Sequence, residues 1–447
     1  MNIFKKYFGD LFIPLRFYIA AGGCIVFFII AFFVPRLSSF ATILFAVFVL
    51  LSLIDYAFLF FNRRVPVAQR IVNDRLSNGD ANKISLRLRN PFPFAISLRV
   101  IDELPFQFQE RRFSMKKDLP ARGNGRLNYT IKPTERGQYG FGDIILYIQT
   151  KLGLIERRYV APGEELVSVY PSFLNLRGQQ LMSSKTTTDG TGNRRMRKIG
   201  QSMEFEQVKD YVNGDDIRTI NWKATARKGQ LMVNSYVDEK SQQVYCIIDK
   251  GRLMKMPFNG LSLLDYAINS ALALSNICLK KQDKIGMISF SNKMGSVIAA
   301  DRNPIQREHI LNALYQEKTA FLESDYELLY TQLRHKIKQR SLLILFTNFE
   351  SLNGLQRQLP YLRAIAKHHL LLVVFFENTE LSRLAGADAY NVDDVYVKTI
   401  SEKFVYEKKL VVKELQKYGI ISILSTPENL TVNAINKYLE LKARQAV

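Results

Sequence analysis

The sequence has 447 residues, with 62 Lys and Arg against 41 Asp and Glu, for a formal net charge of +21. It lacks the ordered basic and aromatic platform of an RNA- or DNA-binding module, so we expect no nucleic-acid partner. An anionic membrane surface accounts for the same excess, because each basic residue held close to it gains about 1 kcal/mol.

Two long apolar segments come first. Residues 15–34 and 40–61 each supply about the 20 residues that a helix needs to cross a hydrocarbon core. The short turn between them predicts an antiparallel transmembrane hairpin over residues 1–64. A secretory signal peptide is the alternative, but the first segment is too long for one and the second follows at once.

Basic residues flank the hairpin on both outer sides, and its turn holds only Arg36. Positive-inside bias therefore predicts a multi-pass membrane protein whose remaining chain is cytoplasmic. Asp55 lies inside the second segment, where an ionisable side chain is by default a candidate functional residue. It is near the cytoplasmic end, where protonation, a partner on the first helix or water can accommodate it, so we interpret its role as structural.

Residues 65–175 alternate between apolar and polar side chains, as in 84–89 and 96–100, with turn residues in between. Several short strands of this kind predict a small β-sandwich. Residues 176–203 then lose this periodicity. Gly190 and Gly192 suggest a phosphate-binding loop, but no G-x-x-x-x-G-K-[ST] motif is present. We predict a flexible basic linker, with lipid headgroups as a possible contact.

Residues 241–447 alternate between continuous apolar strands and helical segments, including a long helix predicted over 395–418. This order predicts a mostly parallel, doubly wound α/β sheet. Ligands of such sheets bind beyond the carboxyl ends of the strands. Asp249 and Asn348 follow two of the predicted strands and mark a candidate site.

The most distinctive segment, 204–240, begins EFEQVKDYVNGDDIRTINWKATAR. It resembles the signature of domain-of-unknown-function family 58 (DUF58), bacterial membrane proteins often associated with MoxR-type AAA+ ATPases. The match covers the aromatic positions, the Gly-Asp-Asp turn, Arg218, the Trp-Lys pair and Arg227. Lys209 departs from the usual Arg and cannot make a bidentate contact. Residues 135–139 also resemble the family.

Two interpretations of this segment stay open. Its aromatic residues can pack on the sheet domain while its charges pair internally, or it can be a surface that a protein partner recognises. Under the second interpretation the contacts also include the loops around Asp249, Ser324 and Asn348. The residues expected to bind the partner in the segment itself are Glu206, Tyr211, Asp215, Asp216, Arg218, Trp222, Lys223 and Arg227.

The resemblance implies a von Willebrand factor A-like fold for the C-terminal domain. In that fold a D-x-S-x-S loop, a Thr and an Asp hold a divalent cation. Here Asp249 matches, but Gly251 and Leu253 replace both serines and Asn348 replaces the second Asp. Ser324 stands near the Thr position. With so few oxygen ligands, and with Lys250 and Arg252 nearby, we expect no cofactor and no Mg²⁺. Asp249 is then expected to cap the next helix or to pair with Lys250 or Arg252.

The four histidines form no metal or catalytic set, so we expect no enzyme. We expect a scaffold or adaptor in the bacterial inner (cytoplasmic) membrane. By resemblance, its partner is a MoxR-type AAA+ ATPase acting in envelope assembly or stress. The alternative is a metal-dependent ligand-binding module of the von Willebrand factor A type.

Overall fold

A computed structural model describes residues 9–62, 64–110, 113–172, 203–213, 215–238, 241–319 and 321–444. The chain divides into two compact units, residues 1–170 and 171–447. Each unit is described by itself. Almost all of the predicted linker, 176–203, lies outside the described residues.

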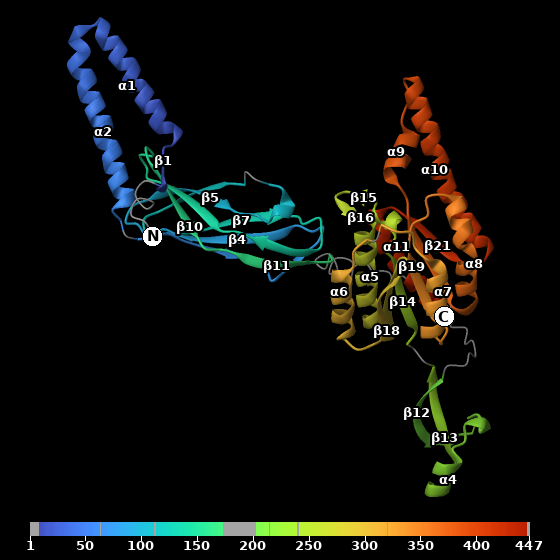
Figure 1. The fold of residues 1–447 in the computed structure, drawn as a ribbon. Helices are drawn as coiled ribbons and strands as arrows, with labels where there is room; N and C mark the ends of the chain where they lie inside the picture. Colours follow the sequence, from blue (N-terminus) through green and yellow to red (C-terminus); the bar gives the residue numbers. More distant parts are fainter. Residues whose placement is uncertain are drawn as a thin grey trace. The chain divides into compact units, whose positions relative to one another are not determined.

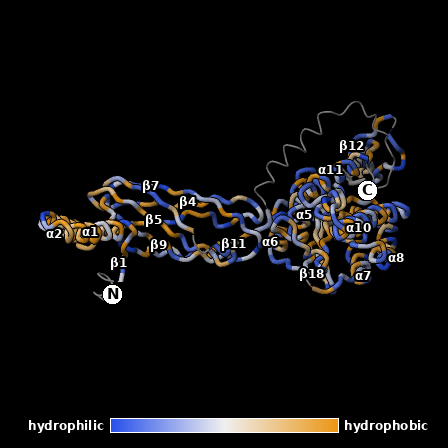
Figure 2. The backbone as a smooth tube through the Cα atoms, turned by 90° about the horizontal axis from the view of Figure 1, so that it is seen from above, coloured by the Kyte–Doolittle hydropathy of each residue, from blue (hydrophilic) through white to orange (hydrophobic). Residues whose placement is uncertain are grey.

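The first unit begins with two apolar helices, α1 (Leu15–Phe33) and α2 (Ser38–Phe60), which pack against each other. Both are long and apolar enough to cross a membrane. Most of their large apolar side chains are exposed, and Figure 2 shows both helices as hydrophobic over most of their length. A core helix of a soluble protein would bury such side chains, so these helices are typical of a membrane anchor. Pro35 follows α1 in the short turn η2 (Pro35–Leu37).

Three sheets follow, and their strands share one hydrophobic core (Figure 1). Strand β4 shows the reason, because its buried and exposed residues alternate along its length. The first sheet has the order β1 (Leu11–Phe12), β10 (Glu156–Ala161), β9 (Ile144–Gln149), β5 (Ile96–Asp102), β6 (Met115–Leu119). The other two are β3 (Arg75–Ser77), β11 (Glu165–Tyr170), β8 (Gly137–Phe141) and β2 (Val67–Ile71), β4 (Asn82–Arg89), β7 (Asn124–Ile131).

The end of α2 is fixed to this β-domain. Leu59 and Phe60 belong to its core. Asp55 is buried and accepts hydrogen bonds from the Thr150 hydroxyl and from the backbone N–H groups of Leu154 and Ile155, both at 2.9 Å. The partner of Asp55 is therefore the β9–β10 loop. Neither the first helix nor water is needed to accommodate this carboxylate.

Arg157 makes a second connection at the same place. Its guanidinium donates to the Leu59 carbonyl, one of the last carbonyls of α2, and stacks over the rings of Phe60 and Tyr159 at 4.6 and 4.5 Å. A cation at a helix C-terminus satisfies carbonyls that lack a helical partner. The anchor and the β-domain are thus joined by polar contacts as well as by packing.

The second unit contains a six-stranded sheet of order β18-β17-β14-β19-β20-β21. Strands β14 (Gln243–Asp249), β17 (Lys284–Phe290), β19 (Leu342–Phe346), β20 (Leu370–Phe376) and β21 (Ile421–Ser425) are parallel. They are continuous apolar runs because helices cover both faces of the sheet. β18 (Met294–Asp301) is an antiparallel edge strand that pairs with β17.

Helices α7 (Tyr326–Lys336), α8 (Leu352–His368) and α10 (Val392–Lys417) share a core with alternate residues of the strands. Helices α5 (Leu263–Lys280), α6 (Gln306–Gln316) and α11 (Leu430–Ala443) pack on the other face (Figure 1). α5 begins with a capping box between Ser262 and Asp265. The short strands β15 (Pro257–Phe258) and β16 (Leu261–Ser262) precede it. α9 (Thr379–Gly386) was not predicted, and it packs along α10.

Candidate functional site

Asp249 ends β14 at the carboxyl edge of the sheet and is buried. Its Oδ1 accepts hydrogen bonds from the backbone N–H of Gly251 at 2.8 Å and from the Ser324 hydroxyl. Its Oδ2 accepts from the Thr347 hydroxyl at 2.7 Å and from the Tyr326 hydroxyl at 3.3 Å. The chain itself therefore satisfies both carboxylate oxygens. Burial raises the pKa of Asp249, and the hydrogen bonds from Ser324 and Thr347 oppose that rise.

The basic neighbours of Asp249 are engaged elsewhere. Lys250 pairs with Glu317 at 2.7 Å, and Arg252 pairs with Glu323 at 2.8 Å. The expected pairing of Asp249 with Lys250 or Arg252 is therefore wrong, and so is a helix-capping role. Instead Asp249 joins the ends of β14 and β19 to the start of α7.

The Asp249 cluster does not fit a divalent cation. It brings together one carboxylate and three hydroxyls, fewer than the six or more oxygen ligands that hard cations take. A Cβ atom at Gly251 would lie 2.1 Å from Ser324 Oγ, so the Ser324 side chain occupies the space that a serine at residue 251 would need. Among the described residues no three His, Cys, Asp or Glu side chains form a metal-binding group.

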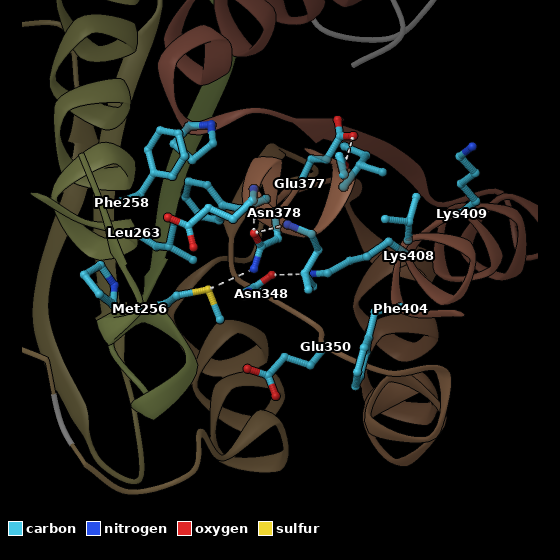
Figure 3. A pocket seen from close by; sticks show the side chains of 18 residues that line it. Met256, Phe258, Leu263, Asn348, Glu350, Glu377, Asn378, Phe404, Lys408 and Lys409 are labelled. Atoms are coloured by element: carbon cyan, nitrogen blue, oxygen red, sulfur yellow. Dashed lines mark hydrogen bonds between the residues drawn. The ribbon is translucent and has the colours of Figure 1, made fainter. Parts of the chain in front are cut away.

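Asn348 follows β19, and its side-chain oxygen bonds to Lys408 and not to Asp249. Its Oδ1 accepts a hydrogen bond from Lys408 Nζ at 2.6 Å, inside a pocket of about 440 Å³ (Figure 3). The pocket lies at the carboxyl ends of β19, β20 and β21, the edge predicted to bind ligands. Its apolar wall consists of Met256, Pro257, Phe258, Leu263, Phe376, Leu381, Phe404, Val405, Leu424 and Pro427. Lys408 was missed because a single lysine in an amphipathic helix gives no sequence signal.

The position of Lys408 predicts a pH-dependent stability. Burial lowers the pKa of Lys408 to about 8 from 10.5, although the charge of Glu350 partly opposes this. Between these pH values the unfolded chain binds more protons than the folded one, so stability should rise with pH by about 3 kcal/mol. Lys408→Met should remove this increment, as measured by denaturant unfolding of the full chain in detergent between pH 7.5 and pH 10.5.

Lys409→Met is the matched control, because Lys409 is exposed one residue further along α10 and its side chain points away from Lys408 (Figure 3). The control should keep the rise seen in the unmodified chain. An identical pH profile for the two variants would refute the burial of the Lys408 cation.

The signature segment forms an antiparallel hairpin of β12 (Met203–Asp210) and β13 (Met232–Asp238), connected by η4 (Ile217–Thr219) and α4 (Trp222–Lys228). We call residues 203–238 the signature hairpin. Gly214 of the predicted Gly-Asp-Asp turn lies outside the described residues, and Asp215 and Asp216 follow it. Asp215 accepts from the Val212 N–H at 3.1 Å and from Lys209 Nζ at 2.9 Å. Chiefly the Lys209 contact, and then the Val212 bond, hold the pKa of Asp215 below its usual value.

Two polar residues cap the N-termini of the short helices in the signature hairpin. Asp216 accepts from the Arg218 N–H at 3.0 Å and caps η4. Asn221 accepts from the Ala224 N–H at 3.0 Å and caps α4. Tyr211 is half-buried, and the side chain of Glu206 lies outside the described residues. The predicted role of Glu206 therefore stays a prediction.

Some large apolar side chains of the signature hairpin remain exposed, although Met232 and Val233 are buried. Trp222, the only tryptophan of the sequence, is 70% exposed, and so is Ile217. Arg218, Lys223 and Arg227 are exposed beside them, and none has an ion-pair partner among the described residues. Among the described residues, the expected internal pairing of charges is present only for Lys209 with Asp215 and Lys228 with Asp210.

The carboxyl edge of the sheet also carries exposed apolar side chains. Phe321, in the loop before Ser324, is 72% exposed, with Lys255 Nζ 3.7 Å from its ring centre, and Leu322 is exposed next to it. Asp249 and Asn348 themselves are buried. A partner at this edge would therefore contact the loops that these residues position.

Cys246 and Cys278 offer no nucleophile. Burial raises the pKa of Cys246 to about 12 and that of Cys278 well above its usual value. A thiol reacts as the thiolate, so both side chains are inert at neutral pH.

Residues 207–400 match the family described as "Protein of unknown function DUF58". This confirms the resemblance for that region. "Uncharacterized protein YeaD" of Bacillus subtilis (strain 168) is 23% identical over 198 residues, which are 42% of this chain and 48% of the relative. The chain thus spans about half the length of this curated relative.

Solved structures show weak likenesses. The hypothetical protein BatB of Bacteroides thetaiotaomicron is 14% identical, covers 46% of this chain and all of its own, and has a TM-score of 0.32. An uncharacterized membrane-spanning protein of Vibrio fischeri is 12% identical, covers 44% of this chain and 96% of its own, and has a TM-score of 0.16. Scores this low carry no structural inference.

The DUF58 region contains most of the features above. It includes the signature hairpin from Gln207 onward, the Asp249 cluster and Asn348, and it ends inside α10 before Lys408. Glu206 lies one residue outside it. The described part of the DUF58 region is thus organised as an exposed hairpin followed by strands β14 to β20 of the sheet.

Proposed function

We propose that this chain is a non-enzymatic, membrane-anchored scaffold or adaptor that binds protein partners at the cytoplasmic face of the bacterial inner membrane. The observation that carries the proposal is the exposure of Trp222 and Ile217 beside three cations that have no ion-pair partner among the described residues. Large apolar side chains with a basic rim are typical of protein-binding surfaces, where tryptophan and arginine contribute most of the binding energy.

The two helices support the proposed membrane placement. Most of their large apolar side chains are exposed, which is favourable only in lipid or against another protein. Basic residues before α1 and after α2 favour an orientation with both flanks in the cytoplasm. The contacts of Asp55 and Arg157 would then hold the β-domain next to the membrane.

The expected partner is a MoxR-type AAA+ ATPase, as the family resemblance implies, with a role in envelope assembly or stress. The von Willebrand factor A-like character of the C-terminal domain is part of the same proposal. The parallel sheet and the cluster of Asp249, Ser324 and Thr347 at its carboxyl edge support it. With its carboxylate satisfied by hydroxyls, that cluster would fix the loops at this edge.

The test uses the exposed residues, because replacing buried Asp249 would perturb folding. Trp222→Ala combined with Arg218→Glu should weaken binding of the full chain, in detergent, to the purified ATPase by tenfold or more. Leu166→Ala is the control, since Leu166 is an exposed apolar residue of β11 in the other unit. Equal affinity of the control and the double variant, with both well folded, would exclude the signature hairpin as the binding surface.

A further inference from the structure

A second apolar surface lies at the tip formed by α9, the connection 387–391 and the first turns of α10. α9 and α10 run side by side away from the carboxyl ends of β20 and β21 (Figure 1). We call residues 384–400 the arm tip. Tyr390 is 84% exposed, Val392 80% and Tyr396 71%, and Val395, Val397 and Ile400 are also exposed. Helices of a soluble domain seldom leave this many large apolar side chains in water without a partner.

The arm tip is acidic. Asp388 and Asp393 are exposed, and neither has an ion-pair partner among the described residues. Asp394 is used locally, because its carboxylate accepts from the N–H groups of Tyr390 and Asn391 at 3.1 Å. Unpaired carboxylates disfavour contact with an anionic lipid surface and favour a basic protein surface.

The signature hairpin has the complementary chemistry. It exposes Trp222 and Ile217 together with the cations of Arg218, Lys223 and Arg227. Both surfaces therefore expose large apolar side chains, and the unpaired charges of one are opposite in sign to those of the other. Complementary charges around an apolar centre fix which surfaces associate.

The topology of the sheet separates the two surfaces within one chain. The signature hairpin leads into the amino end of β14, whereas the arm leaves from the carboxyl end of β20, and β14 and β20 run parallel through β19. Seven-residue strands place these two edges about 20 Å apart, and the arm extends further from the sheet. The geometry favours a contact between two copies of the chain over one within a copy.

We propose that the arm tip of one copy binds the signature hairpin of a neighbouring copy. Because the two surfaces differ, the contact is head-to-tail and can continue from copy to copy in a ring or row. Anchoring all copies in one membrane raises their local concentration and favours a weak contact. The inference rests on the proposed role of the signature hairpin as an interaction surface, and a copy and the ATPase would compete for it.

Charge reversal tests the contact in the full chain, purified in detergent with two different tags. Asp388→Lys with Asp393→Lys should lower co-purification of the two tagged copies by tenfold or more, and so should Arg218→Glu with Lys223→Glu. A chain that carries all four substitutions should associate again, because both signs are reversed. Glu402→Lys, an exposed acid further along α10, should have no effect.

Three outcomes would overturn the proposal. The first is that the unmodified chain does not self-associate, and the second is that association is unchanged in both charge-reversed variants. The third is that the chain with all four substitutions does not associate again although its melting temperature is that of the unmodified chain. ATPase binding separates this inference from the proposed function. The arm variants should keep or increase ATPase binding, whereas Trp222→Ala with Arg218→Glu should lose it.

Discussion

Replacing Arg70 with methionine is expected to lower the free energy of unfolding of the β-domain by about 3–5 kcal/mol. Arg70 and Asp102 form a buried ion pair, and Arg70 Nη2 also donates to the Gly142 carbonyl at 2.9 Å. Asp102 accepts a further hydrogen bond from the Tyr129 hydroxyl. Removing the guanidinium leaves a buried carboxylate without its cation, and its desolvation is no longer compensated.

The measurement is hydrogen exchange of the full chain in detergent, followed in peptides of β4, β5 and β9. Arg87→Met is the matched control, since Arg87 is an exposed arginine of β4, the neighbour of β2. Adding Asp102→Leu to Arg70→Met should recover part of the lost stability, because no buried charge then remains. Equal exchange in Arg70→Met and Arg87→Met would contradict the buried pair.

Replacing Asp55 with leucine is expected to release the β9–β10 loop from the end of α2. The change leaves the N–H groups of Leu154 and Ile155 and the Thr150 hydroxyl without their acceptor. Each buried donor left unpaired costs about 1–3 kcal/mol. Exchange of the amides of 150–155 should therefore become much faster, while exchange in β14 of the other unit should not change.

Asp55→Asn separates the hydrogen bonds from the ionisable group. The asparagine oxygen can still accept from both N–H groups, and its amide can donate to the Thr150 hydroxyl, which accepts as well as donates. This variant should stay close to the unmodified chain in loop exchange. If it were as disruptive as Asp55→Leu, the negative charge, and with it a functional role inside the membrane, would have to be considered.

Helices, strands and turns that depend on residues close together in the chain could be predicted from the sequence. The two apolar helices begin and end within two residues of their predicted bounds, because Pro14 and Pro35 limit α1 and long, predominantly apolar segments specify both. The alternation of β4 and the continuous apolar runs of β14, β19 and β20 predicted half-buried and fully buried strands. The bond from Val212 N–H to Asp215 likewise joins residues three positions apart.

The partners of the polar groups could not be predicted in the same way. Asp55 and Thr150 are 95 positions apart, Asp249 and Ser324 are 75 apart, and Asn348 and Lys408 are 60 apart. Which of these groups meet depends on the order of strands in each sheet and on the path of each loop. The sequence therefore predicted where Asp249 and Asn348 lie, at the carboxyl edge of the sheet, and was wrong about what Asp249 pairs with.

By itself the sequence determined an apolar helical anchor, a region of alternating strands, an α/β region and a distinctive Gly-Asp-Asp turn, because periodicity and turn chemistry act over a few residues. Only the tertiary structure decided that Asp55 faces the β-domain, that Lys408 reaches Asn348 in a pocket, and that Trp222 stays exposed. Exposure depends on what the rest of the chain leaves uncovered, and that is a property of packing over the whole unit.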